Sequence, residues 1–158
     1  MKRRICAVAL ALALALFSTT AVQAQTHRTH LGPHISYNFD IEELGVGAQF
    51  SAPIASFLEF YPSFDYYLVN VGSLWALNAD LKLRVAGENV EWLYFGGGLN
   101  ITRASFQGSG NTDAGLNLLA GFETLAGTVH PYGELRFSFS DGSSVQLAFG
   151  LNFTLGSR

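Results

Sequence analysis

The sequence predicts an all-β protein, an eight-stranded antiparallel up-and-down transmembrane β-barrel that follows a cleaved signal peptide. Two observations predict this fold class. The first is an N-terminal segment that is basic and then apolar, and the second is a repeat of stretches, about ten residues long, in which apolar and polar positions alternate before a turn. Together they indicate an exported chain whose strands each have one apolar face.

Residues 1–24 have the parts of a secretory signal peptide. Residues 2–4 are basic, residues 5–17 are apolar, and residues 22–24 carry small side chains at the positions that a signal peptidase reads. The apolar run is shorter than the roughly 20 residues that a membrane-spanning helix needs. We therefore expect residues 25–158 to form one barrel domain outside the inner membrane.

The composition after residue 24 excludes several classes of protein. Six of the nine basic residues and all twelve acidic residues remain, which gives a net charge of −6. The single cysteine, Cys6, lies in the signal peptide, so neither a disulfide nor a thiolate metal site is expected. Nucleic-acid binding needs clustered Lys and Arg, and no such cluster occurs after residue 24. We expect no nucleic-acid partner, no metal and no cofactor.

Eight alternating stretches are expected strands, because successive side chains of a strand point to opposite faces. In order, they cover residues 29–39, 44–52, 57–68, 74–85, 90–105, 114–125, 129–140 and 144–155. The third, fourth and eighth alternate most clearly. In the fifth, the three glycines at 96–98 predict a bulge or a close approach of two backbones. Pro33, Pro62 and Pro131 each remove a backbone donor, and if Pro62 divides the third stretch, the count of eight fails.

The apolar face of these strands is assigned to lipid. Alternation alone also fits a soluble barrel with the apolar face inside. However, the lumen of an eight-stranded barrel is only just wide enough for its own side chains, and the apolar face carries two Trp and many Phe, Tyr and Leu. The opposite face is small and polar, as a narrow lumen requires.

The inward face carries charged residues that we expect to pair and to plug the lumen, because a buried charge without a partner is costly. This expected network consists of Glu59, Asp65, Asp80, Lys82, Arg84, Glu123, Glu134 and Arg136. If the third and fourth strands meet around a turn near Val71, Glu59 faces Arg84. The alternative is a pathway for water or ions, or a gate.

Four aromatic residues are expected at the two membrane interfaces. Tyr66 and Trp75 lie near one end of their strands, and Trp92 and Tyr94 lie near the other end. The alternative is that these aromatics simply fill a core.

The last strand ends in a recognisable pattern. Gly150 is followed by hydrophobic Phe153 and Leu155, which looks like the C-terminal signal of bacterial outer-membrane barrels, although Ala148 is not polar and three residues follow Leu155. With eight strands and a signal peptide, the chain resembles the small outer-membrane β-barrel family typified by outer membrane protein A and outer membrane protein X. The resemblance implies an outer-membrane monomer that contacts membrane lipid and lipopolysaccharide. It also implies assembly by the barrel assembly machinery with periplasmic chaperones.

The resemblance also implies a topology with both termini in the periplasm. The connections at 40–43, 69–73, 106–113 and 141–143 then face outward, and those at 53–56, 86–89 and 126–128 face the periplasm. Only 106–113 has any size. We therefore expect a structural envelope protein. The alternatives are a surface binding protein acting through 106–113 and the aromatic rim, or a narrow pore.

We expect no enzymatic activity and no metal site. His130, Glu134 and Ser138 share one face, but no motif of a catalytic barrel surrounds them. His27, His30 and His34 lack the carboxylate or Cys that would complete a ligand set, so we interpret them as solvated or lumen residues.

Overall fold

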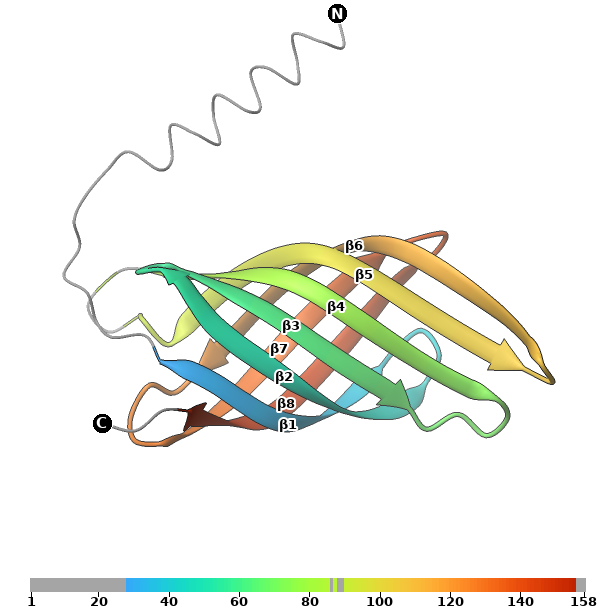
Figure 1. Ribbon diagram of the computed structural model, residues 1–158, viewed down its shortest axis with the longest axis horizontal. Helices are drawn as coiled ribbons and strands as arrows, with labels where there is room; N and C mark the ends of the chain where they lie inside the picture. Colours follow the sequence, from blue (N-terminus) through green and yellow to red (C-terminus); the bar gives the residue numbers. More distant parts are fainter. Residues whose placement is uncertain (1–27, 86, 88–89, 156–158) are drawn as a thin grey trace, which may run out of the picture.

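The computed structural model describes residues 28–85, 87 and 90–155, and the predicted signal peptide, His27 and the last three residues lie outside this part. Eight strands form one closed barrel in which each strand is antiparallel to its sequence neighbours and β1 pairs with β8 (Figure 1). The strands are β1 (Thr29–Asn38), β2 (Glu43–Ala55), β3 (Leu58–Tyr67), β4 (Ser73–Arg84), β5 (Leu93–Phe106), β6 (Ser109–Glu123), β7 (Val129–Phe139) and β8 (Ser143–Leu155). The predicted fold class is confirmed. Within the described residues, no helix has the length and apolar character needed to cross a membrane.

Strand alternation separates two environments. In β4, Asn78, Asp80 and Lys82 are buried, whereas Leu77 and Leu81 are exposed on the outside. The same pattern holds around the barrel, since most buried residues are polar or charged and most exposed large side chains are apolar. This is the reverse of a water-soluble protein and the polarity of a barrel that faces lipid.

Pro62 lies within β3 and does not divide it. The β3–β4 ladder is continuous along the whole of β3. On the other side, the β2–β3 ladder has no pair between Gln49↔Ser63 and Ala52↔Phe60. The missing donor of Pro62 therefore falls in a short gap toward β2, and the count of eight strands stands.

The other two prolines in question are accommodated in similar ways. Pro33 lies in a gap of the β1–β8 ladder, which has no pair between Leu31 and His34. Pro131 accepts a hydrogen bond from the backbone N–H of Thr124, just beyond the end of β6. Its missing donor thus faces a place where the neighbouring strand has already stopped.

Of the two alternatives predicted for residues 96–98, the bulge is not found, and the close approach of backbones is found. β5 pairs in continuous register with both β4 and β6, and the irregularity of the sheet lies in β2 between Pro53 and Ala55. The three glycines instead allow a close approach of backbones. A Cβ added to Gly98 would lie 2.2 Å from the carbonyl oxygen of Ala79, so a side chain cannot be placed there without moving β4.

The predicted loop at residues 106–113 is a tight hairpin. β5 continues to Phe106 and β6 begins at Ser109, so the connection is only Gln107-Gly108. These two residues have φ angles of 47° and 83°, and positive φ at both positions is the requirement of a two-residue type I′ hairpin. Ser109, Gly110 and Asn111, which the sequence assigns to the loop, belong to β6.

The β5–β6 hairpin extends the barrel wall on one side. β1 begins and β8 ends at the same end of the barrel, and the hairpin projects at the opposite end (Figure 1). The β6–β7 ladder starts only at Leu116↔Phe139, so residues 109–115 reach beyond β7. One side of the barrel mouth is therefore taller than the other.

Candidate functional site: the polar lumen

The barrel interior holds all eight charged side chains singled out in the sequence, and we call this set the lumen network. Each member is at most 8% exposed, and the members come from β3, β4, β6 and β7. They are Glu59, Asp65, Asp80, Lys82, Arg84, Glu123, Glu134 and Arg136. They form two groups with different charge balance.

The first group lies toward the end of the barrel that holds the termini, and its charges balance. Lys82 Nζ lies 2.9 Å from Glu123 Oε2 and 3.1 Å from Glu59 Oε2. Arg84 Nη2 donates to Glu123 Oε2 at 2.6 Å, and Arg84 Nε donates to Glu59. Two carboxylates thus share two cations, an arrangement in which removing any one member leaves a buried charge uncompensated.

The rings of two tyrosines enclose Lys82. Its Nζ lies 4.5 Å from the ring centroid of Tyr61 and 4.7 Å from that of Tyr94. Both rings are fully buried and form one apolar cluster with Leu119. Cation–π attraction therefore adds to the ion pairs of the ammonium group.

The register of β3 and β4 differs from the expected one. Glu59 is opposite Lys82 rather than Arg84, because the β3–β4 connection is centred one residue earlier than the expected turn at Val71. A shift of two residues keeps every side chain on its face. The long side chain of Arg84 still reaches Glu59 across the diagonal of the ladder.

The second group lies nearer the middle of the barrel and is rich in carboxylates. Arg136 Nη2 lies 2.9 Å from Glu134 Oε1 and 3.2 Å from Asp80 Oδ2, and its Nη1 lies 3.9 Å from Asp65 Oδ2. His34 Nε2 lies 2.8 Å from Asp65 Oδ1. One guanidinium therefore serves three carboxylates, with an imidazole beside one of them.

Neutral amides connect the network, and sequence reasoning did not single them out. The amide of Asn78 donates to Ser63 at 3.0 Å and to Asp65 at 3.3 Å, and its oxygen accepts from Asn100 at 2.8 Å and Asn117 at 2.9 Å. The available signal was the recurrence of Asn at inward positions of three consecutive strands. Such a side chain, with two donors and an acceptor, can satisfy several charged neighbours at once.

Strand β8 contributes two further amides that join it to distant strands. Gln146 donates to Asp65 at 2.7 Å, and Asn152 donates to Glu123 at 2.6 Å. The oxygen of Asn152 accepts from Gln49 at 2.8 Å. Hydrogen bonds therefore cross the lumen from the last strand to β2, β3 and β6.

The assignment of Tyr94 to a membrane interface is wrong. Tyr94 is 0% exposed, and its hydroxyl donates to Glu134 Oε2 at 2.9 Å inside the lumen. It pairs with inward-facing Arg84, and this register places it on the inner face. Trp92, by contrast, is 48% exposed beside the start of β5. Tyr66 and Trp75 are paired near the other end of the barrel.

The histidines at the terminal end contact lumen groups. The rings of His30 and His130 have centroids 4.6 Å apart. His30 Nδ1 lies 3.5 Å from Glu123, and the two ring nitrogens of His130 lie 2.7 Å from Thr124 O and 2.8 Å from Thr154 Oγ1. Among the described residues, no group of three or more His, Cys, Asp or Glu could hold a metal ion.

The three residues weighed for catalysis bond to different partners. His130 contacts threonines, Glu134 accepts from Tyr94 and Arg136, and Ser138 donates to Asn117 at 2.8 Å. These contacts fix structure rather than align a nucleophile with a base.

The C-terminal pattern divides between the two faces of β8. Phe153 and Leu155 are each 42% exposed on the outer surface. Gly150 faces inward, where an added Cβ would lie 2.5 Å from both Pro33 O and the ring of Tyr132. The two hydrophobic positions are thus presented outward, with a close approach of β1 and β7 at the glycine.

These features define a class: a closed antiparallel barrel of eight strands with an apolar exterior and a polar interior is a small transmembrane β-barrel. No family model matches the chain, and no curated protein matches it. Solved structures do match, and they confirm the predicted resemblance at the level of the fold.

Three structures of small outer-membrane barrels illustrate the likeness. The N-terminal β-barrel domain of OprF from Pseudomonas aeruginosa has a TM-score of 0.67 and 14% identity, covering 80% of this chain and 96% of that one. Neisserial surface protein A has a TM-score of 0.58 and 14% identity, with coverages of 80% and 96%. Ail, the attachment invasion locus protein of Yersinia pestis, has a TM-score of 0.52 and 14% identity, with coverages of 81% and 97%. At this identity the likeness describes the fold alone.

Proposed function

We propose that this chain is an integral outer-membrane β-barrel whose lumen is plugged by its own side chains and whose role in the envelope is structural. The observation that carries the proposal is the lumen network, in which buried cations and carboxylates of facing strands are paired across the interior. A barrel that fills its lumen in this way serves as a stable wall element rather than as a conduit.

The outer surface supports a membrane location. Exposed Leu and Phe side chains cover the strands between the level of Tyr66 and Trp75 and the level of Trp92. Strands of 10 to 15 residues suffice for this span, because a tilted transmembrane strand needs roughly 9 to 11. In this proposal the surface contacts outer-membrane lipid and lipopolysaccharide.

Export and assembly complete the proposal. Residues 1–24 direct export, and Gly150, Phe153 and Leu155 present the signal that the barrel assembly machinery reads after delivery by periplasmic chaperones. The outward position of Phe153 and Leu155 supports this role, since a recognised side chain must be accessible before the barrel closes. The mature chain acts as a monomer.

Two measurements test the proposal together. The folded chain in detergent should migrate differently on a gel before and after boiling, and in planar bilayers it should show no sustained conductance. Migration that does not depend on boiling would contradict the membrane barrel, whereas steady ion current would contradict the plug.

A narrow pore is the second candidate, and a specific observation favours it. The hydroxyl of Tyr132, Nε of Arg136 and Nδ1 of His34 are buried without a hydrogen-bond partner in the described part of the chain. Water molecules would solvate such groups, and a connected file of water is the first requirement of a pathway. Steady current in the bilayer experiment that changes when Arg136 is replaced by Gln would put this function first.

A further inference from the structure

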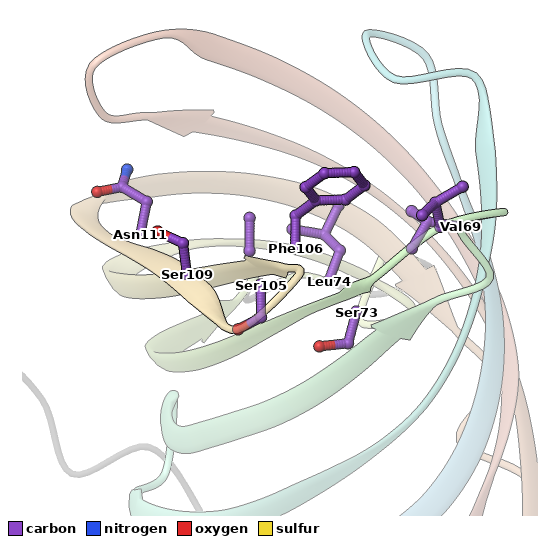
Figure 2. Close-up of a pocket in the computed structure, with 9 residues that line it drawn as sticks. Val69, Ser73, Leu74, Ser105, Phe106, Ser109 and Asn111 are labelled. Carbon is purple, nitrogen blue, oxygen red and sulfur yellow. The ribbon is translucent and has the colours of Figure 1, made fainter.

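A pocket of about 450 Å³ lies at the mouth of the barrel, between the β3–β4 connection and the β5–β6 hairpin (Figure 2). It is separate from the lumen network. Its lining consists of Val69, Val71, Ser73, Leu74, Ala104, Ser105, Phe106, Ser109 and Asn111. We propose that this pocket binds a small, uncharged and largely apolar molecule.

The first argument is a change of polarity along the inner face. Along β5 toward the β5–β6 hairpin, the inward positions are first Asn100 and Thr102 and then Ala104 and Phe106. Along β4 in the same direction, the inward position that follows Ala76 is Leu74. The inner face of β4 and β5 therefore changes from polar to apolar where the wall is tallest, whereas the paired inward positions of β6, Ser109 and Asn111, stay polar. Neither lumen plugging nor lipid contact requires apolar side chains at these positions.

The second argument is that the lining faces water. Ser105 is opposite Ser73, and both lie beyond the level of Tyr66↔Trp75 at the end away from the termini. Phe106 is nevertheless 52% exposed and Val71 is 66% exposed. Apolar side chains gathered in a concave site on the aqueous side gain free energy when a ligand removes them from water.

The third argument identifies the class of occupant. All nine lining residues are uncharged, although Asp113 lies only two residues from Asn111 and accepts its amide at 2.9 Å. The pocket volume lies in the range of about 300 to 1,000 Å³ that is typical of small-molecule sites. A protein partner would engage roughly 20 to 30 residues on each side, many more than line this pocket. The Ser109 hydroxyl and the Asn111 amide lie on the same side as the apolar wall, whereas Ser73 and Ser105 point to the other side (Figure 2). One hydroxyl and one amide beside an apolar wall suit a neutral molecule with one polar group.

The test uses the folded chain in lipid nanodiscs with ¹³C-labelled Val and Leu methyl groups. The probe is 2-naphthylmethanol, which is neutral, and 2-naphthoate is its anionic counterpart. We expect saturable shifts of the methyl signals of Val69, Val71 and Leu74 with the neutral probe and much weaker binding of the anion. The methyl signals of lipid-facing Leu81 should change only linearly with probe concentration, as for partition into the bilayer.

Two variants and a control localise the binding. Phe106→Ala should raise the dissociation constant roughly tenfold, because a large part of the apolar wall is lost, and Ala104→Phe should fill the pocket and abolish saturation. Phe139→Ala is the control, since Phe139 is 47% exposed on the outer face at the end of β7. Unboiled gel migration verifies that each variant is folded.

Three results would overturn the proposal. They are shifts that rise linearly and equally at Leu81 and Leu74, equal affinity for the neutral and anionic probes, and an affinity that neither Phe106→Ala nor Ala104→Phe alters.

Discussion

A single arginine on the outer surface tests which face of the strands meets lipid. Leu81 is 43% exposed on the outer face of the barrel. It pairs with Phe60 on β3 and with Gly97 on β5. Leu81→Arg places a cation on this surface. Ile41→Arg is the matched control, because Ile41 is 40% exposed in the β1–β2 turn, beyond the ends of the strands.

The structure sets the depth of Leu81 in the proposed membrane. Trp75 lies six residues from Leu81 along β4. In the other direction, Arg84 is three residues from Leu81 and pairs with Tyr94, and Trp92 lies two residues beyond Tyr94. The level of Trp92 is therefore five residues from Leu81. At roughly 3.4 Å per residue and a tilt of about 45°, these separations correspond to about 14 Å and about 12 Å along the membrane normal, which together match an apolar band of about 25 Å. Leu81 is therefore near the midplane. There Arg costs about 2 to 4 kcal/mol, against about 0 to 1 near an interface.

Reversible unfolding by urea in phospholipid vesicles measures this cost. The chain contains only two Trp residues, so fluorescence reports on both levels of the barrel. We expect the free energy of unfolding of Leu81→Arg to fall by about 2 to 4 kcal/mol, while Ile41→Arg stays within about 1 kcal/mol of the parent. Equal losses in the two variants would refute the assignment of the apolar face to lipid.

Three further predictions address the lumen and assembly. Glu59→Gln or Arg84→Gln alone should destabilise the barrel by about 3 to 5 kcal/mol, and the double variant should lose less than the sum, whereas additive losses in urea unfolding would mean that the pair does not interact. Tyr94→Phe should cost about 1 to 3 kcal/mol, because Glu134 Oε2 is buried and loses its donor, while Tyr66→Phe should be near neutral; the opposite order would return Tyr94 to the membrane interface. Phe153→Ala should slow the appearance of the unboiled gel form and Phe153→Leu should not, and unchanged kinetics for the Ala variant would remove this residue from the assembly signal.

Strand number and face could be predicted because alternation is a local property. Alternating positions of a strand point to opposite faces, so the apolar positions identify one face without knowledge of the neighbouring strand. A shift of the pairing register by two residues leaves that face unchanged. Register could not be predicted, because it depends on where a turn is centred. The β3–β4 connection contains no strongly directing residue pair before Gly72, whose φ angle is 84°. The residue opposite Glu59 is therefore Lys82, two residues away from the expected Arg84.

Two other predictions differ from the structure because the local sequence is compatible with more than one placement. Residues 109–113 are rich in Ser, Gly and Asn, which is typical of a loop, yet positive φ at Gln107 and Gly108 alone closes the hairpin. The position of Tyr94 near the end of its strand predicts an interfacial aromatic, but its register with Arg84 places it inside. In both cases pairing with a neighbouring strand, which a local pattern does not contain, decided the outcome.

The hydrogen bonds that β8 makes across the lumen have a consequence for the folding of the chain before the barrel closes. Gln146 and Asn152 reach Asp65 and Glu123, whose strands are far away in the sequence. Until β8 docks against β1, water can solvate these carboxylates, so a sheet that has not yet closed keeps one wettable side. Docking exchanges that water for amide donors at several places at once. The interior thereby favours the correctly closed barrel, because Asp65 and Glu123, already paired with cations of other strands, gain these further donors only when the last strand docks in its register.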